Sequence, residues 1–355
     1  MGRTNKSKKS VKTLQLIFLI IVLLIAAVYE YRHRGNSQDR VKVNSKDLTV
    51  MFYNVENLFD PQDAPTQMDD DYTPHGKKHW TYKKYHDKLK HIAKVIELIG
   101  GDDLPDIIGL AEIEDRKVLE DLISQEPLRK ANYKIIHYES LDPRGIDVAL
   151  LYKPSEFRYI SDKQIFLYSK KGHKMHTRPI LEVIGEYKGQ KVYIFVNHWK
   201  SRVPDQKETE YKRIIAAAAL YNEVRKILRD DPNANIIIMG DFNDTCHDRS
   251  IKKKLKARLD RNFKSPNELY NAMAAVCKKG RGTTYHGGDW YMFDQIIVSQ
   301  ALLDTSGLYL VKADIFSGDD LLIKKHGKVY PNRAFVHNEY TGGVSDHLPV
   351  YAIIK

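Results

Sequence analysis

Residues 235–244 read Asn-Ile-Ile-Ile-Met-Gly-Asp-Phe-Asn-Asp, a short apolar run followed by a glycine and polar residues. The run from Ile236 to Met239 is short, apolar and rich in β-branched residues, which predicts a strand buried on both faces. Gly240 permits a sharp turn after that strand. Asp241 and Asn243 are spaced by two, so extended backbone would present both side chains on one face. The stretch is either an ordinary turn or one edge of a polar site, and the rest of the chain decides between them.

Other predicted strands begin or end at polar residues in the same way. These strands cover 48–53, 106–112, 192–196, 293–299 and 345–354. At the end of the strand over 106–112, Glu114 is the alternative to Glu112 as the site carboxylate. The polar residues at the strand ends are Asn54, Glu112, Asn197, His198, Asp241, Asn243, Asp294, Asp346 and His347. Any one of them has an ordinary structural explanation, but the set indicates a shared site.

The pattern of elements predicts an α/β fold. Apolar residues spaced by three and four predict amphipathic helices over 85–99 and 207–229. Further strands are expected over 144–152 and 177–184, the second of which opens with Arg178. Strands outnumber helices, which favours two sheets packed face to face and flanked by helices.

Composition restricts the function classes. The chain has 355 residues and a net charge of +11, but seven of its 57 basic residues and one of its 46 acidic residues lie in 1–34, which leaves +5 on the remainder. This smaller positive charge mildly supports a polyanionic substrate. The two cysteines, Cys246 and Cys277, exclude a disulfide scaffold and a zinc cluster, and leave one possible bridge. A nucleophilic role for Cys246 is the less favoured alternative, because nothing nearby in the sequence would depress its pKa.

The N-terminal region predicts membrane attachment. A basic tail covers 1–13, a transmembrane signal-anchor covers 14–31, and a polar linker covers 32–46, ahead of one catalytic domain over 47–355. Basic residues before the apolar segment outnumber those after it, which predicts a cytoplasmic N-terminus and an exported body, periplasmic or extracellular. The alternative is a cleaved signal peptide and a secreted protein, because the apolar length lies between the two classes.

The polar residues suggest phosphoryl chemistry. Glu112 and Asp346 are hard oxygen donors, which favours Mg²⁺, with Mn²⁺ or Ca²⁺ as alternatives. Two histidines beside carboxylates suit proton transfer near neutral pH. Arg178 and Lys200 would hold an anion.

These motifs resemble those of the endonuclease/exonuclease/phosphatase superfamily, which has the deoxyribonuclease I-like fold. The resemblance covers about residues 47–355, and the motifs occur in the order expected for the superfamily. The segments that carry it are Asn54-Val-Glu-Asn, Ala111-Glu112, Arg178-Pro179, Asn197-His198, Gly240-Asp241-Phe242-Asn243, the strand with Asp294, and Ser345-Asp346-His347. It implies a four-layer α/β/β/α sandwich of two mostly antiparallel sheets and metal-dependent phosphoester hydrolysis.

The resemblance also implies roles for these residues. Glu112 resembles the principal metal ligand, supported by Asn54 and Asp346. His347 resembles the general base, and Asp294 resembles the acid that orients its ring.

Asp241 and Asn243 resemble the pair that orients the attacking water or the phosphate. His198 resembles the second histidine, which stabilises the transition state or protonates the leaving oxygen. Arg178 resembles the phosphate-contacting arginine, and Asn197 and Lys200 are expected to bind substrate with it. The tyrosine and acid that usually accompany the second histidine have no clear match, and Asp147 and Tyr152 are the candidates.

The fold hosts nucleases, inositol phosphate phosphatases and sphingomyelinases, so it does not settle the substrate. Lys200 and Arg202 add two cations after His198, and the Asn-Val-Glu-Asn-Leu-Phe opening resembles exported bacterial nucleases. We therefore expect an endonuclease that cleaves DNA or RNA with little sequence specificity. The alternative is a membrane-proximal phosphatase or phospholipase of the inositol phosphate or sphingomyelin type. A binding module without activity would require loss of the metal and base residues, and no feature implies a protein partner.

Overall fold

The computed structural model describes residues 40–41, 43–44, 46–65, 67–100 and 103–355. The predicted basic tail and signal-anchor lie outside these described residues. Within the described part of the chain, none of the helices combines the length and apolar character needed to cross a bilayer. The compact unit comprises Val41–Lys355. Val41 and Val43 already pack against its core, so the folded body begins before the expected boundary at 47.

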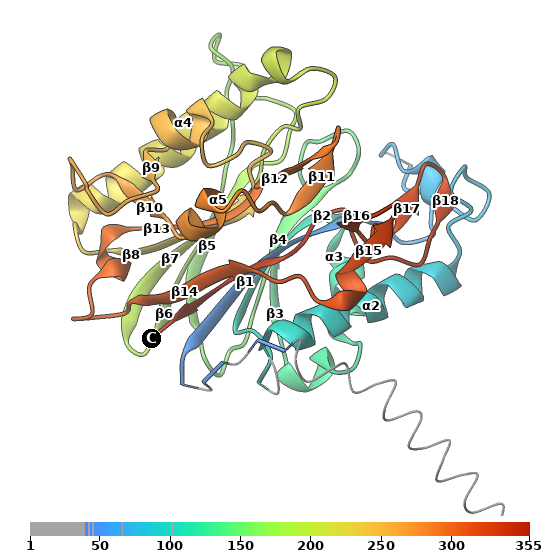
Figure 1. Ribbon diagram of the computed structural model, residues 1–355, viewed down its shortest axis with the longest axis horizontal. Helices are drawn as coiled ribbons and strands as arrows, with labels where there is room; N and C mark the ends of the chain where they lie inside the picture. The colour runs from blue at the N-terminus through green and yellow to red at the C-terminus, as the bar shows by residue number, and fades with distance from the viewer. Residues whose placement is uncertain (1–39, 42, 45, 66, 101–102) are drawn as a thin grey trace, which may run out of the picture. The chain divides into compact units, whose positions relative to one another are not determined.

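Two mixed sheets form the centre of this unit (Figure 1). The first sheet has the strand order β14 (Leu310–Ile315), β19 (Val350–Ile354), β1 (Leu48–Leu58), β2 (Ile107–Ile113), β4 (Asp147–Tyr152) and β3 (Lys134–His137). The second has the order β5 (Arg158–Ile165), β6 (Ile180–Tyr187), β7 (Gln190–His198), β8 (Asn235–Asp241), β13 (Asp294–Val298), β10 (Leu269–Asn271) and β9 (Ala257–Arg258). The pairs β1/β2, β7/β8 and β9/β10 are parallel, and the other neighbours are antiparallel.

Three small hairpins complete the strands: β11 (Thr284–His286) with β12 (Asp289–Tyr291), β15 (Leu322–Lys325) with β16 (Lys328–Pro331), and β17 (Phe335–Val336) with β18 (Glu339–Tyr340). The α-helices are α2 (Tyr82–Gly100), α3 (Arg116–Ile123), α4 (Gln206–Asp230) and α5 (Ala274–Lys278). Short helical turns lie at Asp70–Tyr72, Leu128–Ala131, Ser250–Lys254, Gln300–Leu303 and Asp319–Leu321.

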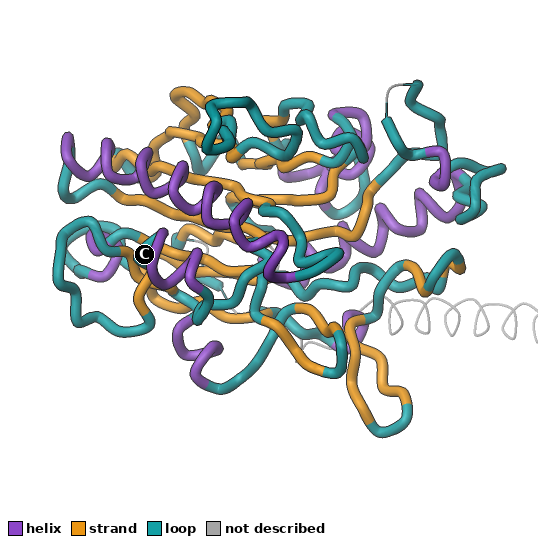
Figure 2. Tube along the Cα trace, turned by 90° about the horizontal axis from the view of Figure 1, so that it is seen from above, coloured by secondary structure: helices purple, strands orange, loops and turns teal. Residues whose placement is uncertain are grey.

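The helices cover the outer faces of the sheets, which gives four layers (Figures 1 and 2). α4 lies over the second sheet, whereas α2 and α3 lie on the far side of the first. The side chains of β8 show why this order of layers is stable. Ile236 and Ile238 join the apolar cluster under α4, and Ile237 and Met239 join the cluster between the sheets. The prediction of a strand buried on both faces is therefore confirmed.

The two sheets approach closely where a glycine faces a methionine. A Cβ atom on Gly109 of β2 would lie 2.5 Å from Met239 Sδ of β8. Absence of a side chain at this position lets the central strands of the two sheets pack directly on one another. This contact lies two strand positions before Asp241 and three before Glu112, and so it brings their strand ends together.

Several boundaries differ from the sequence predictions. β1 continues past Tyr53 to Leu58 through a register shift, with Glu56 and Asn57 in left-handed conformations (φ 51° and 52°). β6 begins at Ile180, so Arg178 lies just before it, and the last strand begins at Val350, so His347 precedes it. A disulfide joins Cys246, in the loop after β8, to Cys277 of α5. This pairing realises the single bridge that the sequence allowed.

Candidate active site

Strand register brings three of the predicted residues side by side in the second sheet. His198, the last residue of β7, is the parallel partner of Asp241 at the end of β8. Asp294, the first residue of β13, is the antiparallel partner of the same Asp241. Because two strands end where the third begins, three functional side chains share one edge of this sheet.

The first sheet delivers a second group at its own edge. Asn54 of β1 pairs with Ala111 of β2, so Glu112 follows next to it. Glu112 adopts a left-handed conformation (φ 64°), and its Oε2 accepts a 2.9 Å hydrogen bond from the Asn57 amide. Such a conformation costs a non-glycine residue about 1–2 kcal/mol and is typical of functional sites. The strained turn therefore holds the Glu112 carboxylate in a fixed direction.

One amide group joins the two sheets at this edge. Asn54 Nδ2 donates to Glu112 Oε1 and to Asp241 Oδ2, each at 3.1 Å. Asn54 is fully buried, and its Oδ1 accepts from the Glu56 amide. Asn54 thus holds two carboxylates from different sheets around one point.

His347 and Asp294 form a buried pair beside these carboxylates. His347 Nδ1 lies 2.7 Å from Asp294 Oδ2, and its Nε2 lies 3.9 Å from Asp241 Oδ2. Burial alone would lower the pKa of His347, but the charges of Asp294 and Asp241 outweigh burial and raise it. The same burial raises the pKa of Asp241 to about 7. The pair has the arrangement of a histidine oriented by an acid.

His198 stands between the two carboxylates on the other side. Its Nε2 lies 3.7 Å from Asp241 Oδ2 and 3.9 Å from Glu112 Oε1. Burial lowers its pKa, and repulsion from Arg178 and Arg144 lowers it further. These effects favour the neutral form of the His198 imidazole.

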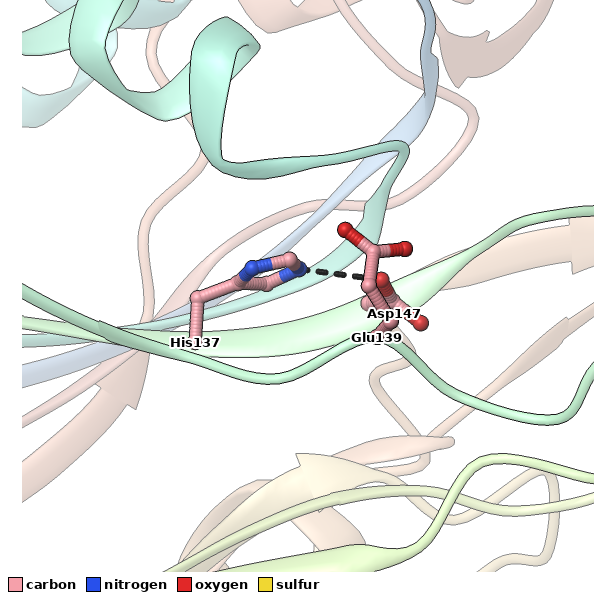
Figure 3. A group of neighbouring side chains, drawn as sticks. All are labelled: His137, Glu139 and Asp147. Carbon is pink, nitrogen blue, oxygen red and sulfur yellow. Dashed lines mark hydrogen bonds and ion pairs between the residues drawn. The ribbon is translucent and has the colours of Figure 1, made fainter. Parts of the chain in front are cut away.

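The expected partner of His198 is missing among the described residues. Its Nδ1 is buried without a hydrogen-bond partner there. Asp147 instead binds His137 at 2.9 Å, with Glu139 beside them (Figure 3). Tyr152 stacks on Tyr159 at the other end of β4. Neither candidate from the sequence orients His198.

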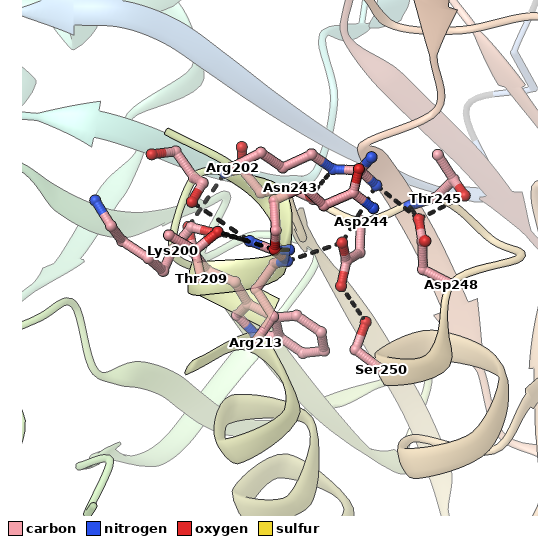
Figure 4. Close-up of polar contacts among 12 residues, drawn as sticks. Lys200, Arg202, Thr209, Arg213, Asn243, Asp244, Thr245, Asp248 and Ser250 are labelled. Carbon is pink, nitrogen blue, oxygen red and sulfur yellow. Dashed lines mark hydrogen bonds and ion pairs between the residues drawn. The ribbon is translucent and has the colours of Figure 1, made fainter. Parts of the chain in front are cut away.

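The loop after β8 is fixed by a network of charges (Figure 4). Asp241 Oδ1 accepts from the Asn243 amide at 2.9 Å, and Asn243 Nδ2 donates to the Trp199 carbonyl at 3.1 Å. Asp244 pairs with Arg202 at 3.2 Å and with Arg213 of α4 at 2.8 Å. Arg213 is fully buried, so this pair ties the loop that carries Asp241 and Asn243 to the helix layer.

The donor set fits a hard divalent cation. Glu112 and Asp241 direct carboxylate oxygens at one shared amide, and Asp241, Asp294 and His347 offer ligand atoms within 4.8 Å of one another. Buried carboxylates this close repel one another unless a proton or a cation lies between them. Of the three predicted metal ligands, Glu112 shares the Asn54 amide with Asp241. Asn54 turns its nitrogen, not its oxygen, toward the carboxylates.

Asp346 lines the same cleft but pairs with Arg333 at 3.2 Å. Its side chain is 33% exposed, so its carboxylate remains reachable from the cleft. Arg333 also lies 3.4 Å from Glu56, a buried acid whose pKa is raised to about 7 by burial. Arg333 therefore links the segment before β19 to the end of β1.

The three residues predicted to bind substrate occupy different surroundings. Asn197 is fully buried, donates to the Met239 carbonyl at 3.1 Å and accepts from the Trp199 indole at 3.1 Å. It lies on the face of β7 opposite to His198, so the predicted substrate contact of Asn197 is replaced by an internal one. Arg178 and Lys200 line a pocket beside the cleft rather than the cleft itself.

The cleft has a volume of about 410 Å³, and the residues that line it include two arginines and two aromatic side chains that were not predicted as site residues. They are Arg144, Arg202, Tyr291 and Phe293. Arg202 lies 4.7 Å from the Phe293 ring centroid and 5.5 Å from that of Tyr291. Two features of the sequence could have indicated these cleft residues. Arg202 is a cation shortly after His198, and Tyr291 and Phe293 are aromatic residues shortly before Asp294.

Comparison with known proteins agrees with this geometry. The model of a family described as the Endonuclease/Exonuclease/phosphatase family matches residues 49–355. A search of curated proteins found no match.

Solved structures share the fold at low sequence identity. The human Nocturnin catalytic domain with a bound sulfate anion is 16% identical, with a TM-score of 0.56 over 89% of this chain and 96% of that one. TDP2 from D. rerio complexed with a single-strand DNA product is 14% identical, with a TM-score of 0.51 over 87% and 99%. A mannosyl-6-phosphatase from Bacteroides thetaiotaomicron is 17% identical, with a TM-score of 0.53 over 87% and 99%. At these identities the likeness concerns the fold.

Proposed function

Because this chain belongs to the endonuclease/exonuclease/phosphatase family, whose members hydrolyse phosphoester bonds, we propose that it is a metal-dependent nuclease. The proposed reaction is cleavage of DNA or RNA phosphodiester bonds, as an endonuclease with little sequence specificity. One observation carries the proposal: residues from Asn54 to His347 in the sequence converge on a single cleft, across two sheets.

The cation supplies charge stabilisation for the phosphoryl group when it is bound. Glu112 and Asp241 are the residues proposed to hold it, with Asp346 reachable from the same cleft. Mg²⁺ is the favoured ion, because the donors are hard oxygens, and Mn²⁺ or Ca²⁺ are the alternatives.

His347 and Asp294 are proposed to move the proton of the attacking water. Asp294 engages Nδ1 of the ring, which leaves Nε2 to accept the proton. The same acid stabilises the imidazolium that results. Asn243 and Asp241 would orient the water or the phosphate.

His198 is proposed to assist at the leaving oxygen. Its neutral form can donate a hydrogen bond from one ring nitrogen to the transferring phosphoryl group. Absence of an acidic partner for its Nδ1 within the described chain argues for this hydrogen-bonding role over general-acid protonation.

The proposal is tested with the full chain, assayed against plasmid DNA, RNA, sphingomyelin and inositol phosphates, with Mg²⁺ and with EDTA. We expect Mg²⁺-dependent nicking of plasmid and loss of that activity in His347→Ala and Glu112→Ala, by at least about 100-fold. Folded variants that retain near wild-type activity would refute the mechanism. Lipid or inositol phosphate hydrolysis without nicking would refute the substrate.

A phosphatase or phospholipase is the second candidate. The fold is shared with a mannosyl-6-phosphatase, and the apolar N-terminal segment would hold the domain near lipid headgroups. The aromatic side chains Tyr291 and Phe293 in the cleft suit a base or an acyl chain equally well.

We also propose that the body is exported and held at the membrane by the N-terminal segment. The Cys246–Cys277 bridge supports this, because structural disulfides persist mainly outside reducing compartments. Protease should digest the body in intact cells if the body is extracellular, and only in cells with a permeabilised outer membrane if it is periplasmic. Protection in both cases would contradict export.

A further inference from the structure

A second hollow opens beside the catalytic cleft, with a volume of about 530 Å³. Four cationic side chains line it and one carboxylate does so: Arg144, Arg178, Lys200 and Lys212, with Asp142. Arg144 also lines the catalytic cleft, so the two hollows meet at this residue. We call this hollow the basic pocket.

The buried arginine of the basic pocket is fixed in advance. Arg178 is buried, its Nη1 pairs with the Asp142 carboxylate, and its Nη2 donates to the Trp199 carbonyl at 2.7 Å. Its Nε is also buried and, over the described chain, has no hydrogen-bond partner. Arg144 Nε lies 3.3 Å from the same Asp142. A rigid guanidinium with an unused donor is suited to a tetrahedral anion.

The lysines of the basic pocket leave its positive charge unbalanced. Burial lowers the pKa of Lys200, and repulsion from Arg178, Arg144 and Lys212 lowers it further. Asp142 opposes this effect, but the two arginines already share that carboxylate. Bound anion would remove the repulsion, so the cluster is arranged for a ligand rather than for stability.

We propose that the basic pocket is a second phosphate-binding subsite, which holds a neighbouring phosphate of a nucleic acid strand whose scissile phosphate lies in the catalytic cleft. This inference rests on the proposed nuclease function and specifies its substrate as a strand with several phosphates. A single strand presents one phosphate at every nucleotide, so one chain can occupy both hollows across Arg144. A monoester or a single diester fills the cleft alone.

The experiment compares two substrates in the full chain: a dinucleoside monophosphate with one phosphodiester, and an eight-nucleotide single strand. The variant is Lys200→Ala combined with Lys212→Ala. The control is Lys226→Ala, which removes an exposed lysine from the same helix as Lys212. We expect the double variant to raise KM for the octamer about tenfold and to affect the dinucleotide much less.

Salt dependence gives a second readout. Loss of the contact with one phosphate of a single strand should reduce the slope of log KM against log salt by about 0.7. The double variant should show this reduction with the octamer, whereas Lys226→Ala should keep the wild-type slope. Octamer binding in EDTA, followed by fluorescence anisotropy, should weaken in parallel without any turnover.

The outcomes separate the two proposals. A wild-type enzyme that cleaves both substrates, with an unchanged octamer KM and salt slope in the double variant, would overturn the subsite and leave the nuclease proposal standing. A wild-type enzyme that cleaves neither, but hydrolyses inositol polyphosphates, would overturn the nuclease proposal. Equal loss on both substrates would place the lysines in the catalytic cleft and also overturn the subsite.

Discussion

At the scale of single residues, the clearest pair is His347 with Asp294. Asp294 is fully buried and lies 2.7 Å from His347 Nδ1. Asp294→Asn keeps the size of the side chain but removes the charge that stabilises the protonated ring. We expect kcat to fall by about 10²–10⁴.

Thermal unfolding of Asp294→Asn would serve as the control, because a structural defect would lower the Tm. A kcat within threefold of the wild type, in a folded variant, would show that His347 does not depend on this acid for its function.

Asp142 provides a prediction on stability and pH. Burial raises its pKa, but the nearby Arg178 and Arg144 outweigh burial, and the net result lies below the ordinary value of 3.8. A depressed folded-state pKa contributes stability above the unfolded value, and this contribution is lost as the pH falls through the folded value.

Asp142→Ala leaves Arg178 buried without its anion, which costs about 3 kcal/mol at pH 7. We expect the difference in free energy of unfolding between wild type and variant to persist from pH 7 to about pH 4 and to close below it. Urea titrations across this range measure the difference. A difference that grows as the pH falls would contradict the assignment.

At the scale of elements, the sequence predicted the helices and strands that are long enough to show a hydrophobic pattern. The helices over 85–99 and 207–229 correspond to α2 and α4, and the buried strand at 236–239 corresponds to β8. Their apolar faces are long enough to define a period. The short edge strand β9 and the hairpin β11/β12 were missed, because two or three residues define no period and their pairing depends on distant strands.

The residues of the candidate site also divide into those that the local sequence pattern predicts and those that depend on distant parts of the chain. Glu112, Asp241 and Asp294 were predicted from strand ends, and strand register brings them together. Arg144 and Phe293 were missed as cleft residues, because loop paths and side-chain directions decide their position. Asn197 was assigned to the substrate from the resemblance of the Asn197-His198 motif, but adjacent residues of a strand face opposite ways, and Asn197 is fully buried.

The contact between β7 and β8 gives a prediction for an element. A Cβ atom on Gly240 would lie 2.3 Å from the Asn197 carbonyl oxygen, which is backbone and cannot move aside. Gly240→Ala should therefore destabilise the fold by about 3 kcal/mol and shift the neighbouring Asp241.

Gly307→Ala is the matched control, because its nearest heavy atom is Gln190 Oε1 at 3.2 Å, the end of a flexible side chain. That variant should change the free energy of unfolding by about 0.5 kcal/mol or less. Equal effects of the two substitutions would show that the strands tolerate a side chain at Gly240.

At the scale of the whole molecule, the sandwich is joined at one edge by polar groups rather than by apolar packing. Asn54 bridges carboxylates from the two sheets, and Asp241 lies within 4 Å of both histidines. Buried like charges at this edge oppose the packing of the sheets until a cation compensates them. Metal binding should consequently stabilise the entire unit.

The resulting prediction concerns metal and unfolding, not catalysis. Mg²⁺ or Mn²⁺ at about 100 times its dissociation constant should stabilise the fold by about 2.7 kcal/mol, seen as a rise in Tm that EDTA reverses. Glu112→Gln should abolish this rise, because it removes a charged ligand while keeping the side-chain volume. Glu97→Gln, on α2, should retain it and controls for loss of an acid elsewhere. If the Tm of the wild type did not change on addition of the metal, the carboxylates would share a proton instead of a cation.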